Sequence, residues 1–152
     1  MPDVVISDAS CLIILDKIKK VDILKGLYQN IITTPEVASE FGNPLPLWIG
    51  VKESTDKKYQ KVLETSIDAG EASAIALSLD YREPLLLLDD LKARKMAKKL
   101  GLVFTGTLGV LVKARKSGLI EELKPVINLI RETDFRLSDA IIDEILKEVG
   151  EI

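Results

Sequence analysis

Short runs of apolar residues alternate along the chain with longer segments in which apolar residues recur at helical spacing. The runs are rich in Val, Ile and Leu, which is typical of strands in a parallel sheet that is covered on both faces. The expected strands are residues 3–7, 31–34, 85–88 and 102–105, with 47–51 as an edge strand or an irregular crossing. The expected helices are 9–18, 21–28, 35–41, 56–66, 71–80, 91–100, 106–117, 120–132 and 137–149.

This order of elements predicts the fold class. Strands that alternate with helices form parallel α/β sheets, because each return to the same edge requires a crossover. We expect an α/β fold, a three-layer α/β/α sandwich with a central, mainly parallel sheet, in a single domain over 1–152. Ligands of such sheets bind outside the carboxyl ends of the strands, so the residues that follow each strand are the candidates for chemistry.

Composition and the first residues of the chain indicate the cellular compartment in which the protein is expected. No apolar run reaches the ~18 residues of a membrane span, and the start, Met-Pro-Asp, lacks the basic and apolar regions of a secretory signal. The one cysteine, Cys11, excludes an intrachain disulfide framework. We therefore expect a cytoplasmic protein with no membrane attachment.

The absence of histidine narrows the chemistry. It excludes a Ser-His-Asp triad, a Cys-His pair, a histidine general base and a histidine-containing zinc site. What remains is chemistry by carboxylates, lysines, hydroxyls, tyrosines or a hard metal ion. The formal net charge of −3 gives the whole chain no basic character, so any surface for nucleic acid must be local.

Carboxylates follow two of the expected strands. Asp8 comes directly after the first, and Asp89 and Asp90 follow the strongly apolar run 85–88. Glu40 and Glu71 lie on helices expected near the same edge of the sheet. Clustered carboxylates repel one another unless a proton or a cation neutralises them, and oxygen ligands alone select Mg²⁺ or Mn²⁺.

Each acid also has a purely structural interpretation. Asp8, Asp89 and Asp90 precede helices and could act as N-caps. Glu71, in a first helical turn, favours the helix dipole, and Glu40 could be exposed to solvent. The remaining acids near these segments have no comparable placement and are expected to be surface charges: Glu64, Asp68 and Asp80.

Four motifs in this order resemble the PIN-domain superfamily over nearly the whole chain, from Val4 to about Gly150. The opening Asp8-Ala9-Ser10 after a short strand is similar to the first motif, and a helix bearing Glu40 follows at a matching distance. Residues 70–76 (GEASAIA) resemble the third motif, and 85–90 (LLLLDD) the strand with the fourth acid. Residues 106–111 (GTLGVL) resemble one poorly characterised, VapC-like prokaryotic branch.

The resemblance implies a PIN-like fold and an endoribonuclease that depends on Mg²⁺ or Mn²⁺, with RNA as substrate. It also implies a homodimer and, as in many members, a toxin held by a small antitoxin protein. Asp8, Glu40, Glu71 and Asp90 would be catalytic and bind the metal, with Asp89 as an alternative ligand. Ser10 and Thr107 could orient a ligand or a bound water, although hydroxyls near helix starts usually act as caps. Two departures weaken the match: the third acid is usually Asp, and Leu88 replaces the usual hydroxyl.

A basic helix follows the Asp89-Asp90 pair. Lys92, Arg94 and Lys95 are the candidates for RNA contacts, and Arg94 is the best single one because it lies one turn after Asp90. A solvated helix face is the ordinary alternative. For the whole protein, the main alternative is a PIN-fold binding or scaffold module with weak or no activity. A haloacid-dehalogenase-type phosphohydrolase would need an acid where Ser10 stands.

Overall fold

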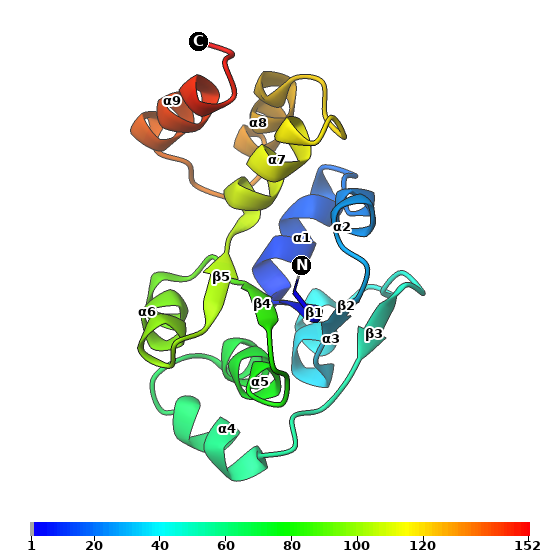
Figure 1. Ribbon diagram of the computed structural model, residues 1–152, viewed down its shortest axis with the longest axis vertical. Helices are drawn as coiled ribbons and strands as arrows, with labels where there is room; N and C mark the ends of the chain where they lie inside the picture. Colours follow the sequence, from blue (N-terminus) through cyan, green and yellow to red (C-terminus); the bar gives the residue numbers. More distant parts are fainter. Residues whose placement is uncertain (1) are drawn as a thin grey trace.

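The computed structural model describes residues 2–152, in which nine helices surround a five-stranded, all-parallel sheet (Figure 1). The strands are β1 (Val4–Ser7), β2 (Ile31–Thr33), β3 (Ile49–Val51), β4 (Pro84–Leu87) and β5 (Val103–Thr105). The helices are α1 (Ala9–Lys17), α2 (Asp22–Leu27), α3 (Pro35–Phe41), α4 (Lys57–Leu63), α5 (Ala69–Ser78), α6 (Leu91–Lys99), α7 (Thr107–Lys116), α8 (Leu123–Arg131) and α9 (Asp139–Glu148). The predicted three-layer α/β/α class is confirmed.

The strands bury side chains on both faces with a period of two. Val5 and Leu87 belong to the core cluster that also contains residues of α1, α2, α7 and α8. Ile6, Leu86 and Leu88 belong to a second cluster, with residues of α5 and α6. Because β1, β2 and β4 contribute to both cores, their sequences are largely apolar, which is the pattern that predicted them.

The strand order, β3-β2-β1-β4-β5, determines where a ligand can bind. The chain builds the sheet from β1 toward β3 and then returns to the other side of β1 with β4 and β5. Ligand sites of open α/β sheets lie at the carboxyl ends of the strands where this order reverses. Here that point is the pair β1 and β4, the two strands followed by Asp8 and by Asp89.

Two boundaries differ from expectation in an informative way. Within the uncertain segment 47–51, only Ile49–Val51 forms an edge strand, β3, which pairs in parallel with β2. Helix α5 begins at Ala69, two residues earlier than predicted, because the Asp68 side chain accepts a hydrogen bond from the backbone N–H of Glu71 and caps the helix.

The last three helices gather at one end of the molecule (Figure 1). Helix α8 contacts α7 and α9 contacts α8, and their buried residues Ile127, Ile142 and Leu146 extend the core on the α1 side of the sheet. The apolar stripe of these helices is thus largely explained by intramolecular packing.

Glu151 fastens this helical end. Its carboxylate accepts hydrogen bonds from the backbone N–H groups of Leu123 (2.6 Å) and Lys124 (3.0 Å) and from Nε of Arg115 (3.1 Å). Burial alone would raise its pKa, but these three donors together lower it below the usual value. Glu151 therefore caps α8, whose own N-cap residue, Glu122, makes no side-chain cap hydrogen bond.

Replacing Glu151 with alanine is expected to lower the melting temperature at neutral pH by about 2–4 °C, the effect of losing a cap worth about 1 kcal/mol. Because the pKa is lowered in the folded state, this stabilisation is present above the ordinary carboxyl pKa and disappears as the pH falls through the folded value. Thermal unfolding at neutral and at acid pH measures both effects. Glu148→Ala, which removes only an exposed pair with Lys116, serves as the control; an equal shift in both variants would contradict the prediction.

Candidate active site

Asp8 follows the carboxyl end of β1. It lies at the centre of the group of acidic side chains at this end of the strands, which we call the acidic edge, and it is only 2% exposed. It caps α1, because its Oδ1 accepts a hydrogen bond from the backbone N–H of Cys11 at 2.9 Å. Its Oδ2 accepts a second from the backbone N–H of Asp89 at 3.2 Å. The cap interpretation is therefore correct for Asp8, but it accounts for only one of the two carboxylate oxygens.

Asp8 has an unusual charge state. Burial, followed by the nearby charge of Asp89, raises its pKa to about 8, although the N–H groups of Cys11 and Asp89 oppose the shift. The ion pairs within residues 2–152 involve other acids and leave Asp8 without a basic partner. A buried carboxylate without a positive partner needs a proton or a cation.

Asp89 is held by Thr107. The backbone N–H of Thr107 donates to Oδ1 of Asp89 at 2.8 Å, and the Thr107 hydroxyl donates to Oδ2 at 2.6 Å. Thr107 is fully buried in the first turn of α7, and its hydroxyl bonds Asp89 instead of capping its own helix. Since the backbone of Asp89 in turn donates to Asp8, a chain of hydrogen bonds runs from α7 through Asp89 to Asp8.

Gly106 makes this arrangement possible through its lack of a side chain. A Cβ atom at this position would lie 2.6 Å from Oδ1 of Asp89 and 3.0 Å from Nη2 of Arg94. The Arg94 guanidinium lies over the ring of Phe104, with its carbon 5.1 Å from the ring centroid. Its Nε is buried and has no hydrogen-bond partner among the described residues. Arg94 thus reaches the acidic edge without forming an ion pair with an acid of residues 2–152.

Glu71 and Asp90 form the neighbouring part of the edge. Burial, then the charges of Asp68 and Asp90, raise the pKa of Glu71 to about 7. Glu71 and Asp68 form a capping box at the start of α5. Asp90 is exposed and caps α6 by accepting a hydrogen bond from the N–H of Ala93 at 3.0 Å. Asp68, expected to be a plain surface charge, is instead a direct neighbour of Glu71.

Glu40 approaches the same group from α3. Its Oε1 lies 3.3 Å from the position that a Cβ of Gly70 would occupy, and Asp68 is close to the same position. Burial and the charge of Asp68 raise its pKa, although the side chain is largely exposed. A buried hydrogen bond of 2.6 Å between the hydroxyls of Thr34 and Ser73 joins α3 to α5 and so positions Glu40 beside Gly70 and Asp68 at the start of α5.

The remaining candidates divide clearly. Ser10 is exposed and makes no hydrogen bond to an acid within the described part of the chain. Lys92 and Lys95 are exposed on α6. The choice between the two aspartates resolves into two environments, because Asp89 lies against Asp8 and Thr107, whereas Asp90 influences Glu71. The contacts of Asp68, Gly106 and Thr107 depend on tertiary packing, and only Thr107 was foreseen from the sequence.

The side chains of the site have the chemistry that a divalent metal ion requires. All the side chains offer oxygen ligands, and Asp8 in particular is a buried carboxylate without a counter-charge. The distances are looser, because no three acidic or thiol side chains within residues 2–152 lie close enough to hold an ion together. Binding would therefore require the carboxylates to draw together from their present positions.

The sheet is open and parallel, and the acidic site lies at β1 and β4, where the strand order reverses. These two features define the general class of this protein. The chain belongs to the PIN-domain family, since a family model described as a PIN domain matches residues 4–151. No curated relative matches the chain at a significant level. PIN domains are generally nucleases, typically with divalent metals. Among the described helices, none is both long and apolar enough to cross a membrane.

Replacing Thr107 with valine is expected to reduce nuclease activity by about 10–100-fold, the usual effect of removing a residue that orients a ligand. Valine keeps the shape but removes the hydroxyl that donates to Asp89. Thr107→Ser, which retains that hydroxyl, should recover most of the activity. Measuring the apparent Mn²⁺ affinity beside the cleavage rate separates this role from simple destabilisation; a serine variant as weak as the valine variant would contradict the prediction.

Proposed function

We propose that this protein is a metal-dependent endoribonuclease that cleaves RNA phosphodiester bonds at the acidic edge formed by β1, β4, α3, α5 and α6. The observation that carries the proposal is Asp8, a buried carboxylate whose pKa is raised to about 8 and which has no basic partner among residues 2–152. Folding tolerates such a group most readily if a cation is its natural partner.

In this proposal Asp8, Glu40, Glu71 and Asp90 hold one or more Mg²⁺ or Mn²⁺ ions. Such an ion would activate water for attack at neutral pH and would stabilise negative charge on the phosphate. Asp89 orients Asp8 through its backbone N–H, because its own carboxylate is engaged by Thr107. Ser10, exposed beside Asp8, is available to contact a metal-bound water or the substrate.

Basic side chains of α6 would bind the RNA. Arg94 is the strongest candidate, because its guanidinium reaches Gly106 and Asp89 at the edge itself. Its stacking on Phe104 holds the group in place, and a fixed guanidinium suits a phosphate. Lys92 and Lys95 are exposed on the same helix. Their positive charge would attract the RNA phosphates on either side of the bond that is cut.

The wider role follows the family. PIN nucleases act on RNA and often pair with antitoxins. We propose a cytoplasmic toxin of this kind, acting as a homodimer and restrained by a small antitoxin protein. A scaffold or binding module is the second candidate, and one observation favours it: in the described part of the chain, no three acids lie close enough together to hold an ion.

Two measurements on the wild-type protein separate these candidates. Calorimetric titration with Mn²⁺ reports whether the acids bind metal, and incubation with a panel of single-stranded RNAs, with Mn²⁺ or with EDTA, reports cleavage. The nuclease proposal expects both metal binding and cleavage that EDTA abolishes. Neither binding nor cleavage by folded protein would favour the scaffold, and metal binding without cleavage would indicate that the RNA or a partner is missing.

A further inference from the structure

A groove of about 390 Å³ lies between α6 and the turn that joins α4 to α5. We call it the α6 groove. One wall carries three lysines of α6, Lys92, Lys95 and Lys99, and the other carries the hydroxyl residues Thr65 and Ser66. Figure 1 shows the position of α6 beside α5, with α4 below them. Its polar lining therefore consists of ammonium groups and hydroxyls, with no carboxylate.

The lysines of this groove share one face of α6. Their spacing of three and four residues places them in a row along the helix, and seven residues of helix span about 10 Å. The ion pairs found within residues 2–152 engage other basic residues, so these three ammonium groups have no acid to neutralise them. On a chain with a net charge of −3 this is a local concentration of positive charge.

Both walls of the groove lead along the chain to residues of the acidic edge. The turn that forms one wall leads directly into Asp68, the cap of α5, and Lys92 on the other wall follows Asp90, the cap of α6, by two residues. A ligand that lies in the groove therefore points along α6 toward the carboxylates. An extended polyanion that passes through both places fits this arrangement better than a compact anion, which would need only one end.

The apolar part of the groove indicates what part of the polyanion it meets. Ile67 and Met96 complete the lining, and no aromatic side chain is among its residues. Bases of a single strand are usually held by stacking on aromatic rings, whereas the sugar-phosphate backbone is held by Lys, Arg and hydroxyl groups. The groove therefore suits the backbone and carries little sequence information.

We propose that the α6 groove holds the phosphate backbone of single-stranded RNA on one side of the bond that is cut. This inference rests on the proposed ribonuclease function and extends it by assigning a path to the substrate, with Lys99, Thr65 and Ser66 as residues that contact it. The RNA would lie along α6 between the acidic edge and the carboxyl end of that helix.

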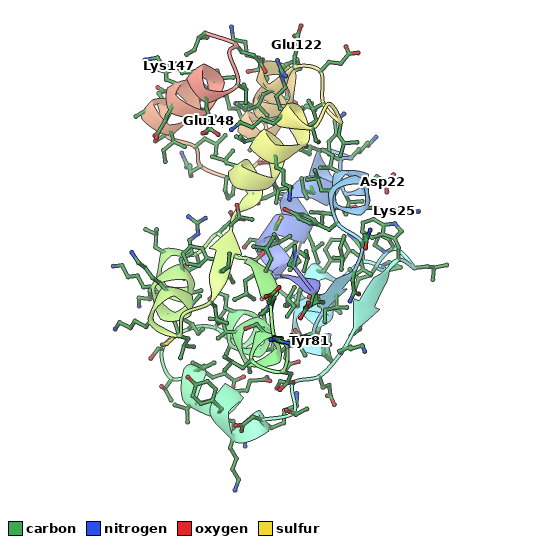
Figure 2. The ribbon with its side chains drawn as sticks, viewed as in Figure 1. Asp22, Lys25, Tyr81, Glu122, Lys147 and Glu148 are labelled. Carbon is green, nitrogen blue, oxygen red and sulfur yellow. The ribbon has the colours of Figure 1, made fainter. Side chains whose placement is uncertain are left out.

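The test compares two triple variants that remove the same charge. The groove variant replaces the three lysines of the α6 groove with glutamine, and the control replaces three exposed lysines on α2, α8 and α9: Lys25, Lys124 and Lys147. Figure 2 places Lys147 at the top of the molecule and Lys25 on its right side, both away from α6 at the lower left. Binding of a fluorescein-labelled single-stranded RNA is measured by anisotropy in EDTA, where no cleavage occurs, over a range of salt concentrations.

The groove variant is expected to bind the RNA about ten-fold or more weakly, and its salt slope should fall by about 2, because each phosphate contact of a single strand contributes about 0.7. The control should change affinity by less than about two-fold. A single substitution, Ser66→Glu, should also weaken binding, whereas Gln29→Glu on the far side of the sheet should not. Equal losses in both triple variants, or none, would overturn the proposal.

Two further outcomes distinguish a wrong groove assignment from a wrong ribonuclease function. If the wild type cleaves RNA with Mn²⁺ and the groove variant binds and cleaves equally well, the groove assignment is wrong and the ribonuclease function stands. If the wild type neither binds nor cleaves RNA, the function fails and the groove assignment fails with it. Displacement of the RNA by polyglutamate of equal charge at equal concentration would overturn RNA in favour of an acidic peptide.

Discussion

Asp8→Asn is expected to reduce Mn²⁺-dependent RNA cleavage by at least about 100-fold, more than the loss of an orienting residue usually causes. Asparagine has nearly the same shape as aspartate but cannot supply the negative charge that a metal ion requires. Its side-chain oxygen can still accept the hydrogen bond from Cys11, so the cap of α1 persists. Cleavage of single-stranded RNA by equal amounts of folded protein, followed on gels, measures the effect.

A matched control lies on the same helix. Asp16 of α1 is exposed, and Asp16→Asn removes the same charge from the protein without touching the acidic edge. Its activity should be close to that of the wild type. In Asp8→Asn, however, the amide nitrogen would face the N–H of Asp89, so the variant could fold less well.

Glu71→Gln provides the safeguard, because glutamine can still accept the capping hydrogen bond from Asp68. It should lose activity to a similar extent while keeping the fold, as judged by circular dichroism. Retention of metal-dependent cleavage by both Asp8→Asn and Glu71→Gln would remove these acids from the mechanism.

Folding stability is expected to fall as the pH rises from about 4 to about 8 in EDTA, and Mn²⁺ is expected to reverse this fall. The pKa of Asp8 rises from an ordinary 3.8 to about 8, and that of Glu71 from 4.5 to about 7. Between these limits the folded state binds more protons than the unfolded state, so the free energy of unfolding decreases with pH. A cation that binds only the folded protein at high pH would take the place of those protons.

Urea unfolding at about pH 5 and about pH 8, with and without Mn²⁺, measures this effect. The midpoint should be lower at the higher pH in EDTA, and Mn²⁺ should raise it there far more than at the lower pH. Asp8→Asn should flatten the dependence on pH, whereas Asp16→Asn should leave it unchanged. Glu151 acts in the opposite sense, but its lowered pKa restricts its effect to more acidic solutions. A midpoint independent of pH and of Mn²⁺ would contradict the assigned charge state of Asp8.

Local signals explain why the elements could be predicted. Helix α3 has the predicted bounds, because Pro35 opens it and Gly42, in the left-handed region at φ 80°, ends it. Apolar runs identified β1 and β4, since both faces of a central strand are buried. Short β3 was ambiguous, because an edge strand of three residues with one exposed side carries little pattern.

The sequence could predict which acids come together at the acidic edge, but not how each of them is bonded. Parallel strands place their carboxyl ends at one edge, so Asp8 and Asp89 had to be neighbours once β1 and β4 were recognised. The partner of each carboxylate was not predictable in the same way. Asp68 was taken for a surface charge, because its neighbour Glu40 is brought to it only by the packing of α3 on α5.

The sequence by itself determined the order of strands and helices, the covered parallel sheet and the acids that follow the strands, since each depends on neighbours in the chain. The tertiary structure decided the link from Thr107 through Asp89 to Asp8, whose hydrogen bonds join residues 18 and 81 positions apart. The tertiary structure also explains why position 106 has no room for a side chain, and it forms the α6 groove. These features depend on how closely different elements approach one another, to within a few tenths of an ångström, and no periodic pattern of residues encodes such precision.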